Sequence, residues 1–370
     1  MCKKKSVCLC EKKQARLDTL AQLGTNPSNI SINAAPSGLN LAVSNEKTLK
    51  KRANRNYLKN SLTLGLVDVL NDKKNKQLAT SKTIFEKQEA INQDKDILRS
   101  YWNMYHCSEQ LVRKSGKITG QYCKNRLCLV CNSIRTAVLL KKYKPVFDDW
   151  SNDSYFVTLT APTVYADNLG DRLDEMHSIF VDIKDVLKKR CQRKNSTKFQ
   201  GVRKLECTYN PFDDKYHPHF HIIIKGEENA RFVYSEWLKR TKHLGTSENA
   251  QDCRKTEGDS AIEVFKYFTK LISSSKKDRL IYLESIDIIF RAFRKRRVIQ
   301  SFGFQLPKDN DGYDIELKED EFLDVEHEIF KWSYSDWYSE TTGEGLTGFE
   351  VSEGMKKLTE RMVKGLRKKT

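Results

Sequence analysis

The chain of 370 residues is long enough to bury one large hydrophobic core or two smaller ones. Its formal net charge of +17 at pH 7 predicts an acidic partner, and nucleic acid is the commonest such partner. No stretch approaches the roughly 20 apolar residues of a membrane helix, and the basic opening residues lack the apolar segment of a signal peptide. We therefore expect a cytoplasmic protein with no membrane partner, whose ten cysteines are thiols or metal ligands rather than disulfides.

Residues 1–95 form a polar N-terminal arm that is poor in aromatic side chains. The stretch 24–45 is rich in Asn, Ser, Pro and Gly, a composition typical of linkers. Cys2, Cys8 and Cys10 lie in this arm without a fourth ligand nearby, which favours plain thiols. We expect the arm to be largely disordered or helical.

Residues 96–145 form a small cysteine-rich element. Cys123, Cys128 and Cys131 follow a C-x4-C-x2-C spacing, with Cys107 upstream. Four thiolates suit a tetrahedral structural Zn²⁺, although the C-x4-C step departs from the common zinc ribbon. The alternatives are four free thiols, or His106 in place of one cysteine ligand.

Two arginines lie beside this cysteine-rich element. Arg126 and Arg135 carry guanidinium groups that can contact phosphates, so we predict that both bind DNA. The remaining cysteines, Cys191, Cys207 and Cys253, have no metal-site spacing and are interpreted as ordinary thiols.

Residues 146–305 mix strand and helix patterns. The alternation of apolar and polar residues, and the helical spacing of apolar ones, separate the two kinds of element. We predict strands at 154–162, 201–210 and 217–226, an edge strand around 250–258, and helices at 168–190, 228–245 and 260–273. Residues 211–216 suit a hairpin loop, so we predict an antiparallel sheet with helices packed on it, an α+β fold.

Three of the seven histidines fall within the stretch YHPHFHIIIKG, residues 216–226. On a strand, His217, His219 and His221 point to one face, while Phe220 and the isoleucines alternate with them toward a core. Two imidazoles at this spacing can converge on one metal ion. The alternative is an exposed polar sheet face on which the histidines are incidental.

Glu206 is the candidate third ligand. On its own strand the apolar positions are Leu205, Cys207 and Tyr209, which puts Glu206 on the polar face with Lys204. The hairpin would bring this carboxylate toward the histidines. A site with two imidazoles and one carboxylate leaves positions open for water and substrate.

The predicted helix 260–273 carries a second candidate group. Glu263 and Tyr267 are four residues apart and so share one helical face, flanked by Lys266 and Lys270. A tyrosine hydroxyl can attack a phosphodiester, a carboxylate can activate water, and lysines can hold the DNA backbone. The alternative is an ordinary amphipathic helix with Tyr267 packed in a core.

Together these stretches resemble the plasmid rolling-circle replication initiators, the Rep proteins of the HUH endonuclease superfamily. FVTLT (156–160) looks like the family's first motif, LECTYN with YHPHFHIII (205–224) like the second, and EVFKYFTK (263–270) like the third. FRAFRKRRVIQSFGF (290–304) is similar to the basic helix and strand that close the domain. CKNRLCLVCNSIR (123–135) resembles the family's cysteine element but has Leu129 where proline usually stands.

The resemblance implies an HUH nicking domain with one tyrosine nucleophile. Tyr267 would nick one strand at the plasmid origin and remain on the 5′ phosphate, and Glu263 would activate water to end replication. His219, His221 and Glu206 would hold Mg²⁺ or Mn²⁺. The expected partners are origin DNA, single-stranded or as a hairpin at the nick, and the host helicase and polymerase.

Residues 306–370 form an acidic and then basic C-terminal tail, for which a solvated segment is one interpretation. Two other functions remain open at this point. One is an HUH relaxase or transposase of a mobile element. The other is a non-catalytic, zinc-dependent DNA-binding regulator, in which the histidines would serve no metal.

Overall fold

The computed structural model describes residues 46–114, 117–150, 152–256, 264, 281–306, 327–360 and 362–363. The chain forms two compact units. The first unit contains the described residues up to Ile134 and those from 327 to Glu360, and the second contains those from Arg135 to 306 with Met362 and Val363. The chain passes from the first unit to the second within the helix Leu129–Asp149 and later contributes two strands to the first unit.

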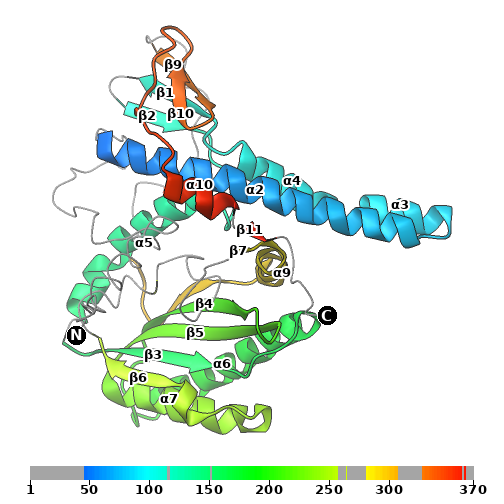
Figure 1. Ribbon diagram of the computed structural model, residues 1–370. Coiled ribbons are helices and arrows are strands. Elements are labelled where there is room, and N and C mark those ends of the chain that lie inside the picture. Colours follow the sequence, from blue (N-terminus) through cyan, green and yellow to red (C-terminus); the bar gives the residue numbers. More distant parts are fainter. Residues whose placement is uncertain are drawn as a thin grey trace, which may run out of the picture. The chain divides into compact units, whose positions relative to one another are not determined.

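Helices dominate the first part of the first unit. α2 (Glu46–Thr80) is followed by α3 (Ile84–Asn92) and α4 (Lys95–Tyr105), and both shorter helices pack on α2 (Figure 1). α2 buries a stripe of leucines at intervals of four residues, namely Leu58, Leu62, Leu66 and Leu70. Residues 46–80 of the polar arm are thus a packed helix, because one apolar stripe suffices when the other faces are polar.

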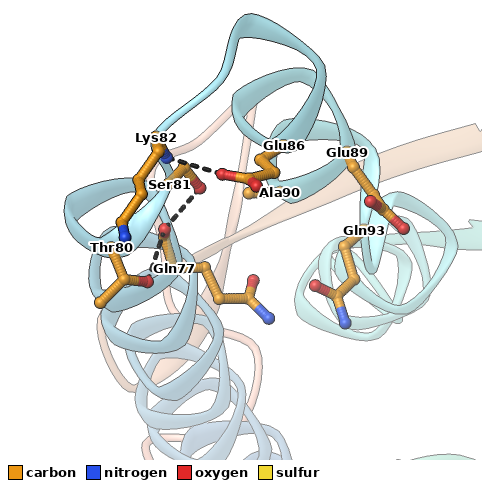
Figure 2. Close-up of a pocket in the computed structure, with 8 residues that line it drawn as sticks. All are labelled: Gln77, Thr80, Ser81, Lys82, Glu86, Glu89, Ala90 and Gln93. Atoms are coloured by element: carbon orange, nitrogen blue, oxygen red, sulfur yellow. Dashed lines mark hydrogen bonds between the residues drawn. The ribbon is translucent and has the colours of Figure 1, made fainter.

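The turn between α2 and α3 is stabilised by local hydrogen bonds. The Thr83 hydroxyl accepts a hydrogen bond from Glu86 N, while the Glu86 carboxylate accepts from the backbone N–H groups of Thr83 and Lys82, which forms a capping box. Figure 2 shows the pocket at this turn, which is lined by Gln77, Thr80, Ser81, Lys82, Glu86, Glu89, Ala90 and Gln93. The polar groups that line this pocket form hydrogen bonds at the end of α2 and at the start of α3.

A four-stranded antiparallel sheet completes the first unit in the order β10-β9-β1-β2. Its strands are β1 (Gln110–Lys114), β2 (Lys117–Gly120), β9 (His327–Ser333) and β10 (Asp336–Ser339), and α10 (Glu353–Glu360) packs on α2. Trp337 is fully buried against the first turns of α2, and its indole N–H donates a 2.7 Å hydrogen bond to the Ser108 carbonyl. Residues 327–360 of the tail are therefore folded into this unit.

The second unit is built on a five-stranded antiparallel sheet in the order β6-β3-β5-β4-β8. The strands are β3 (Ser154–Thr160), β4 (Gly201–Asn210), β5 (Lys215–Lys225), β6 (Asp252–Lys255) and β8 (Ile299–Phe302). The predicted hairpin is the β4–β5 pair, and the predicted edge strand is β6. The α+β fold with helices packed on an antiparallel sheet is confirmed.

Strand alternation divides the apolar side chains between the two faces of this sheet. One face packs Leu205, Phe220 and Ile222 against α6 (Leu169–Gln192) and α7 (Glu227–Thr241) (Figure 1). On the other face, Phe156, Val202 and Ile223 pack with Tyr143 of α5 (Leu129–Asp149). Glu206 and the histidines belong to this second face, as the alternation predicts.

The remaining elements adjust the predicted boundaries. α7 continues into the 3₁₀ turn η3 (Lys242–Leu244), which Gly245 ends with a φ of 79°. α9 (Leu283–Phe293) stops before Arg294, so the predicted basic helix is instead an apolar helix followed by a basic loop. Of the predicted helix 260–273, only the buried and helical Val264 lies within the described residues. Short elements are η2 (Ala166–Asn168), η4 (Glu248–Ala250), β7 (Ile281–Tyr282) and β11 (Met362–Val363).

Candidate functional site

The register of the β4–β5 hairpin brings Glu206 directly opposite His219. In the same register Lys204 lies opposite His221, so both polar residues of β4 share the face of the two histidines. The ligand atoms of Glu206, His219 and His221 all lie within 4.8 Å of one another. The hairpin therefore assembles two imidazoles and one carboxylate at one point of the sheet. We call these three residues the sheet triad.

Both histidines of the sheet triad are oriented through their Nδ1 atoms. His219 Nδ1 lies 3.1 Å from the carbonyl oxygen of His217, an acceptor that requires a protonated Nδ1. His221 Nδ1 lies 3.2 Å from the hydroxyl of Thr158 on β3. Metal-ligating histidines commonly use one ring nitrogen for such a partner and the other for the ion. A metal ion at this point would therefore be held through the Nε2 atoms.

The sheet triad fits a divalent ion after small side-chain rotations. His221 Nε2 is 3.6 Å from Glu206 Oε2. Neighbouring ligands of one octahedral ion lie about 3 Å apart. The three groups, whose ligand atoms lie within 4.8 Å of one another, would therefore have to move closer together to hold one ion. One carboxylate oxygen and two nitrogens suit ions such as Mg²⁺ or Mn²⁺ and leave coordination positions open.

Neighbouring groups keep the carboxyl group of Glu206 ionised. Burial alone would raise the pKa of this carboxyl, but the charges of Lys204, His219 and His221 and the hydrogen bond from Lys204 lower its pKa to about 2. The Lys204 ammonium donates to Glu206 Oε2 at 2.8 Å, and its side chain is only 4% exposed. The carboxylate is therefore ionised and ready to bind a cation at neutral pH.

His217 differs from the other two histidines. Burial, with a smaller contribution from the charge of His219, lowers the pKa of His217 to about 4. Its ring lies 5.3 Å from that of His219, and its carbonyl oxygen orients His219. His217 is absent from the group whose ligand atoms converge in the described residues. Its contribution to this site is the backbone carbonyl.

Four of the predicted site residues lie outside the described residues. These are Glu263, Lys266, Tyr267 and Lys270 of the predicted helix 260–273. Their roles stay predictions.

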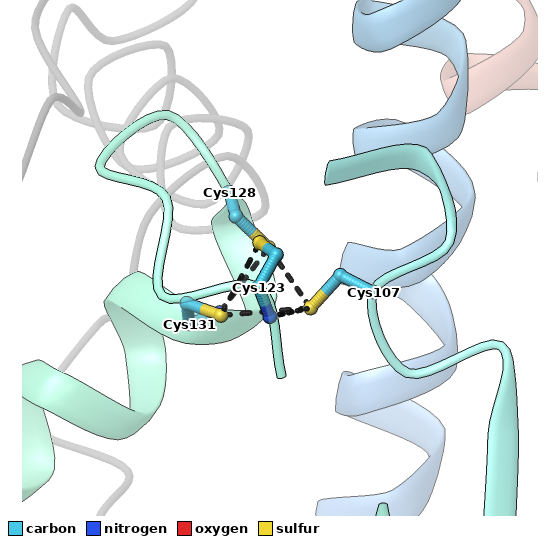
Figure 3. Close-up of side chains that lie close together, drawn as sticks. All are labelled: Cys107, Cys123, Cys128 and Cys131. Atoms are coloured by element: carbon cyan, nitrogen blue, oxygen red, sulfur yellow. Dashed lines mark hydrogen bonds between the residues drawn. The ribbon is translucent and has the colours of Figure 1, made fainter. Parts of the chain in front are cut away.

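Among the described residues of the first unit, the four cysteines Cys107, Cys123, Cys128 and Cys131 converge on one point (Figure 3). The Sγ–Sγ distances are 3.5 Å for Cys107 with Cys131, 3.5 Å for Cys107 with Cys128, and 3.7 Å for Cys123 with Cys131. Four sulfurs at about 2.3 Å from a central Zn²⁺ lie about 3.8 Å apart at the corners of a tetrahedron. The spacing of these thiols therefore matches a tetrahedral metal site without rearrangement.

Backbone N–H groups point at three of these sulfurs. The N–H groups of Cys123, Asn125 and Cys131 donate to the sulfurs of Cys107, Cys123 and Cys128 respectively, each at 3.4 Å. Hydrogen bonds with the other three thiols, Cys123 first, lower the pKa of Cys107. α5 begins at Leu129, and the positive end of a helix also favours thiolates. The hydrogen bond with Cys107 raises the pKa of Cys123, and burial raises the pKa of Cys128. The surroundings therefore favour the thiolate of Cys107, whereas Cys123 and Cys128 require the metal itself for deprotonation.

Lys59 of α2 is a buried cation beside the cysteines. Its side chain is fully buried, and its Nζ donates to the carbonyl oxygens of Tyr105 at 2.8 Å and Cys107 at 2.6 Å. No carboxylate of the described chain forms an ion pair with it. A buried charge without an opposite charge is costly. Four thiolates around one divalent ion carry a net charge of −2, which would supply the missing counter-charge.

Sequence patterns do not reveal Lys59, because it lies 48 residues before Cys107 and approaches it only through the packing of α2. The sequence places Lys204 on the polar face of its strand, but only the structure reveals its hydrogen bond to Glu206.

Arg126 and Arg135 are half-buried, and both make contacts within the protein. Their predicted DNA contacts stay predictions.

Among the described helices, none has the length and apolar composition of a membrane-spanning segment.

Comparison with known proteins gives consistent matches. The family model described as "Replication protein" matches residues 116–338, a range that contains the sheet triad and three of the four cysteines. A protein from Staphylococcus aureus called "Protein rep" is 28% identical over 192 residues, which cover 46% of this chain and 80% of that protein. No solved structure matches the chain.

Two proteins from Bacillus with the same name are also similar. One from a Bacillus species is 32% identical over 178 residues, covering 42% of this chain and 55% of that protein. One from Bacillus amyloliquefaciens is 31% identical over 136 residues, covering 33% of this chain and 38% of that protein. The chain thus spans most of the staphylococcal protein but about half or less of these two.

Proposed function

Because this chain belongs to the replication protein family of plasmid rolling-circle initiators, we propose that it nicks one strand of plasmid origin DNA through a tyrosine nucleophile. The observation that carries this proposal is the sheet triad, in which Glu206, His219 and His221 converge on a polar sheet face. A non-catalytic DNA-binding protein would have no use for an ionised, buried carboxylate oriented toward two imidazoles.

The sheet triad would hold Mg²⁺ or Mn²⁺, which when bound polarises the scissile phosphate and stabilises its developing charge. The residues around it prepare this role. Thr158 and the His217 carbonyl fix the two imidazole rings.

Tyr267 is the proposed nucleophile, on the strength of the resemblance to the third family motif. Its hydroxyl oxygen attacks the phosphorus and gives up its proton, a Tyr–O–P bond forms, and the P–O3′ bond breaks. The protein stays on the 5′ phosphate, and the released 3′ hydroxyl primes synthesis. Glu263 then activates a water molecule at the end of the cycle, and Lys266 and Lys270 hold the DNA backbone.

The cysteine cluster is proposed to hold a structural Zn²⁺, with Arg126 and Arg135 contacting DNA nearby. The tetrahedral sulfur spacing supports the metal, and the buried cation Lys59 supports its tetrathiolate form. The proposed partners are origin DNA, single-stranded or as a hairpin at the nick, and the host helicase and polymerase in the cytoplasm.

The nicking activity is tested with a supercoiled plasmid that carries the protein's own origin. Wild type is expected to form nicked circles and a covalent DNA adduct in Mn²⁺ but not in EDTA, and Tyr267→Phe neither. Tyr334→Phe, at an exposed tyrosine of the first unit, should behave as wild type. Adduct formation by Tyr267→Phe would rule out this nucleophile. Unchanged nicking by His219→Ala/His221→Ala would rule out the metal role of the sheet triad.

The terminating role of Glu263 needs a separate measurement. Glu263→Ala should still nick but release few single-unit circles. Normal circle release by this variant would contradict the proposed activation of water.

A further inference from the structure

The loop between α9 and β8 carries four consecutive basic residues. Of these, only the side chain of Arg296 bonds to other groups of the described chain. Arg296 donates from Nε to Asp174 at 2.8 Å and from Nη2 to the Gly170 carbonyl at 3.1 Å, which ties the loop to α6. Arg294, Lys295 and Arg297 are exposed, and within the described chain their side chains make no hydrogen bond or ion pair. Three cations are thus presented to solvent from an anchored loop.

Strand register places this loop beside the sheet triad. β8 pairs with β4 so that Ile299 lies opposite Lys204, and Leu205 N donates to the Val298 carbonyl one residue further along at 2.7 Å. Continued by one more residue, this register sets Arg297 opposite Glu206. Arg297 precedes the first residue of β8 by two positions. Because paired strands are about 4.8 Å apart, this continuation of the register would bring its backbone close to that of the candidate ligand.

Burial indicates the face on which Arg297 lies. Val298 is 4% exposed and belongs to the same core cluster as Leu205, on the face that α6 and α7 cover. Successive side chains of an extended segment point to opposite faces. The exposed Arg297 therefore shares the face of Glu206 rather than that of the core.

The backbone of the loop is held in an unusual conformation. Lys295 has a φ of 64°, in the left-handed region that residues with a β-carbon seldom adopt. The N–H of Arg294 closes the last turn of α9 on the Phe290 carbonyl at 3.1 Å. A cation just after a helix C-terminus is favoured by the helix dipole, which explains one basic residue here. It does not explain Arg297, which lies beyond the turn.

We propose that Arg294, Lys295 and Arg297 form a phosphate-binding loop that holds single-stranded DNA beside the sheet triad. This inference rests on the proposed function. It adds a surface that binds the phosphates on either side of the scissile phosphate. Guanidinium and ammonium groups bind phosphates without reading bases, so the loop positions the strand and carries no sequence preference. Anchoring by Arg296 reduces the entropy lost when the loop binds.

The loop is tested by fluorescence anisotropy with an oligothymidylate of about 20 nucleotides, longer than most single-strand sites. Binding is measured in EDTA, with every variant also carrying Tyr267→Phe, so that neither metal nor nicking contributes. The loop variant is Arg294→Gln/Lys295→Asn/Arg297→Gln, because asparagine tolerates the positive φ at 295. We expect about tenfold to 100-fold weaker binding at low salt. The slope of log affinity against log salt should fall by about 2, from three lost contacts.

A charge-matched control removes three cations from the opposite face of the sheet. Arg190 on α6 and Arg231 and Lys239 on α7 are 37%, 70% and 78% exposed, and all are replaced by Gln. This control should bind much more tightly than the loop variant. Equal losses in the two triple variants would mean a general effect of net charge and would overturn the loop.

Nicking by the wild type, measured separately in Mn²⁺, distinguishes the two proposals. Wild-type nicking combined with unchanged affinity and salt slope in the loop variant would overturn the loop but leave the nicking function. Absence of wild-type nicking combined with weakened binding by the loop variant would do the reverse. Arg297→Gln alone, whose side chain is exposed, should lower the slope by about 0.7 and repeats the test if the triple variant fails to fold.

Discussion

The Lys204 ammonium donates a 2.8 Å hydrogen bond to Oε2 of Glu206, the same carboxylate oxygen that lies 3.6 Å from His221 Nε2. The ammonium group of Lys204 therefore occupies the carboxylate oxygen that faces His221. Since an ammonium and a divalent ion repel each other and need the same acceptor, Lys204 should oppose metal binding at this site.

Replacement of Lys204 by methionine should strengthen the binding of Mn²⁺. Methionine keeps much of the apolar stem and removes the charge. We expect the Kd for Mn²⁺, measured at pH 7 by isothermal titration calorimetry, to fall about tenfold, or about 1.4 kcal/mol. Lys204→Arg, which keeps the charge, should stay within a few-fold of wild type. Weaker binding by Lys204→Met would show that the lysine instead positions Glu206 for the ion.

The pKa of Glu206 predicts how the second unit responds to acid in the absence of metal. Its pKa is about 2 in the folded protein against an ordinary value of 4.5, so its ionised form stabilises the fold. This stabilisation is present above pH 4.5 and is lost as the pH falls toward 2. It amounts to at most about 3 kcal/mol.

The measurement is the free energy of unfolding in EDTA between pH 7 and pH 3, for wild type and for Glu206→Gln. Wild type should lose more stability than the variant as the pH falls below 4.5. Parallel curves for the two proteins would contradict the stabilising ion pair.

Removal of zinc should destabilise the first unit. We expect about one Zn²⁺ per chain by elemental analysis, and its loss in Cys128→Ser, because four thiolates are needed for the site. The unfolding temperature should fall by about 10 °C or more, since the binding energy of a structural metal contributes to folding. Cys191→Ser, at a thiol on α6 of the second unit, is the matched control and should retain the metal. Wild-type protein without zinc would end this assignment.

Loss of the Lys59 charge should weaken zinc binding without changing its ligands. Lys59→Met removes the buried cation that would offset the −2 charge of a tetrathiolate site. We expect about tenfold weaker zinc binding in competition with a chromogenic chelator, about 1.4 kcal/mol. The Co²⁺-substituted protein should keep its absorption bands, because all four sulfurs remain. Lys76→Met, at an exposed position of α2, should bind zinc as wild type does, and equal affinity in Lys59→Met would exclude the counter-charge role.

The sheet of the second unit could be predicted from local patterns. The same alternation of side chains along each strand places apolar residues in the core and the candidate metal ligands on the other face. The positions of Leu205 and Phe220 on one face imply those of Glu206 and His219 on the other, and the short hairpin sets their register. The cysteine cluster was also predictable in outline, since three of its ligands are close in sequence.

Contacts between distant segments could not be predicted in this way. Lys59 approaches the cysteines only because α2 packs on the segment that carries Cys107. Strand β9 pairs with β1, more than 200 residues earlier, so that Glu328 meets Arg113 at 3.0 Å. Neither contact leaves a pattern in the sequence of the arm or of the tail. The contact of Lys59 depends on how α2 packs, and the pairing of β1 with β9 depends on where the second unit returns the chain.

The pairing of β1 with β9 also has a consequence for biosynthesis. A ribosome releases Gln110–Lys114 long before His327–Ser333, and in between it releases the five strands of the sheet of the second unit. The sheet of the second unit can form before β9 has been synthesised. Because β1 lacks its partner β9 until then, the sheet of the first unit is completed later. A messenger truncated after codon 306 would therefore yield a chain with the hairpin of Glu206 and His219, yet with β1 left as an open edge, a feature that promotes aggregation.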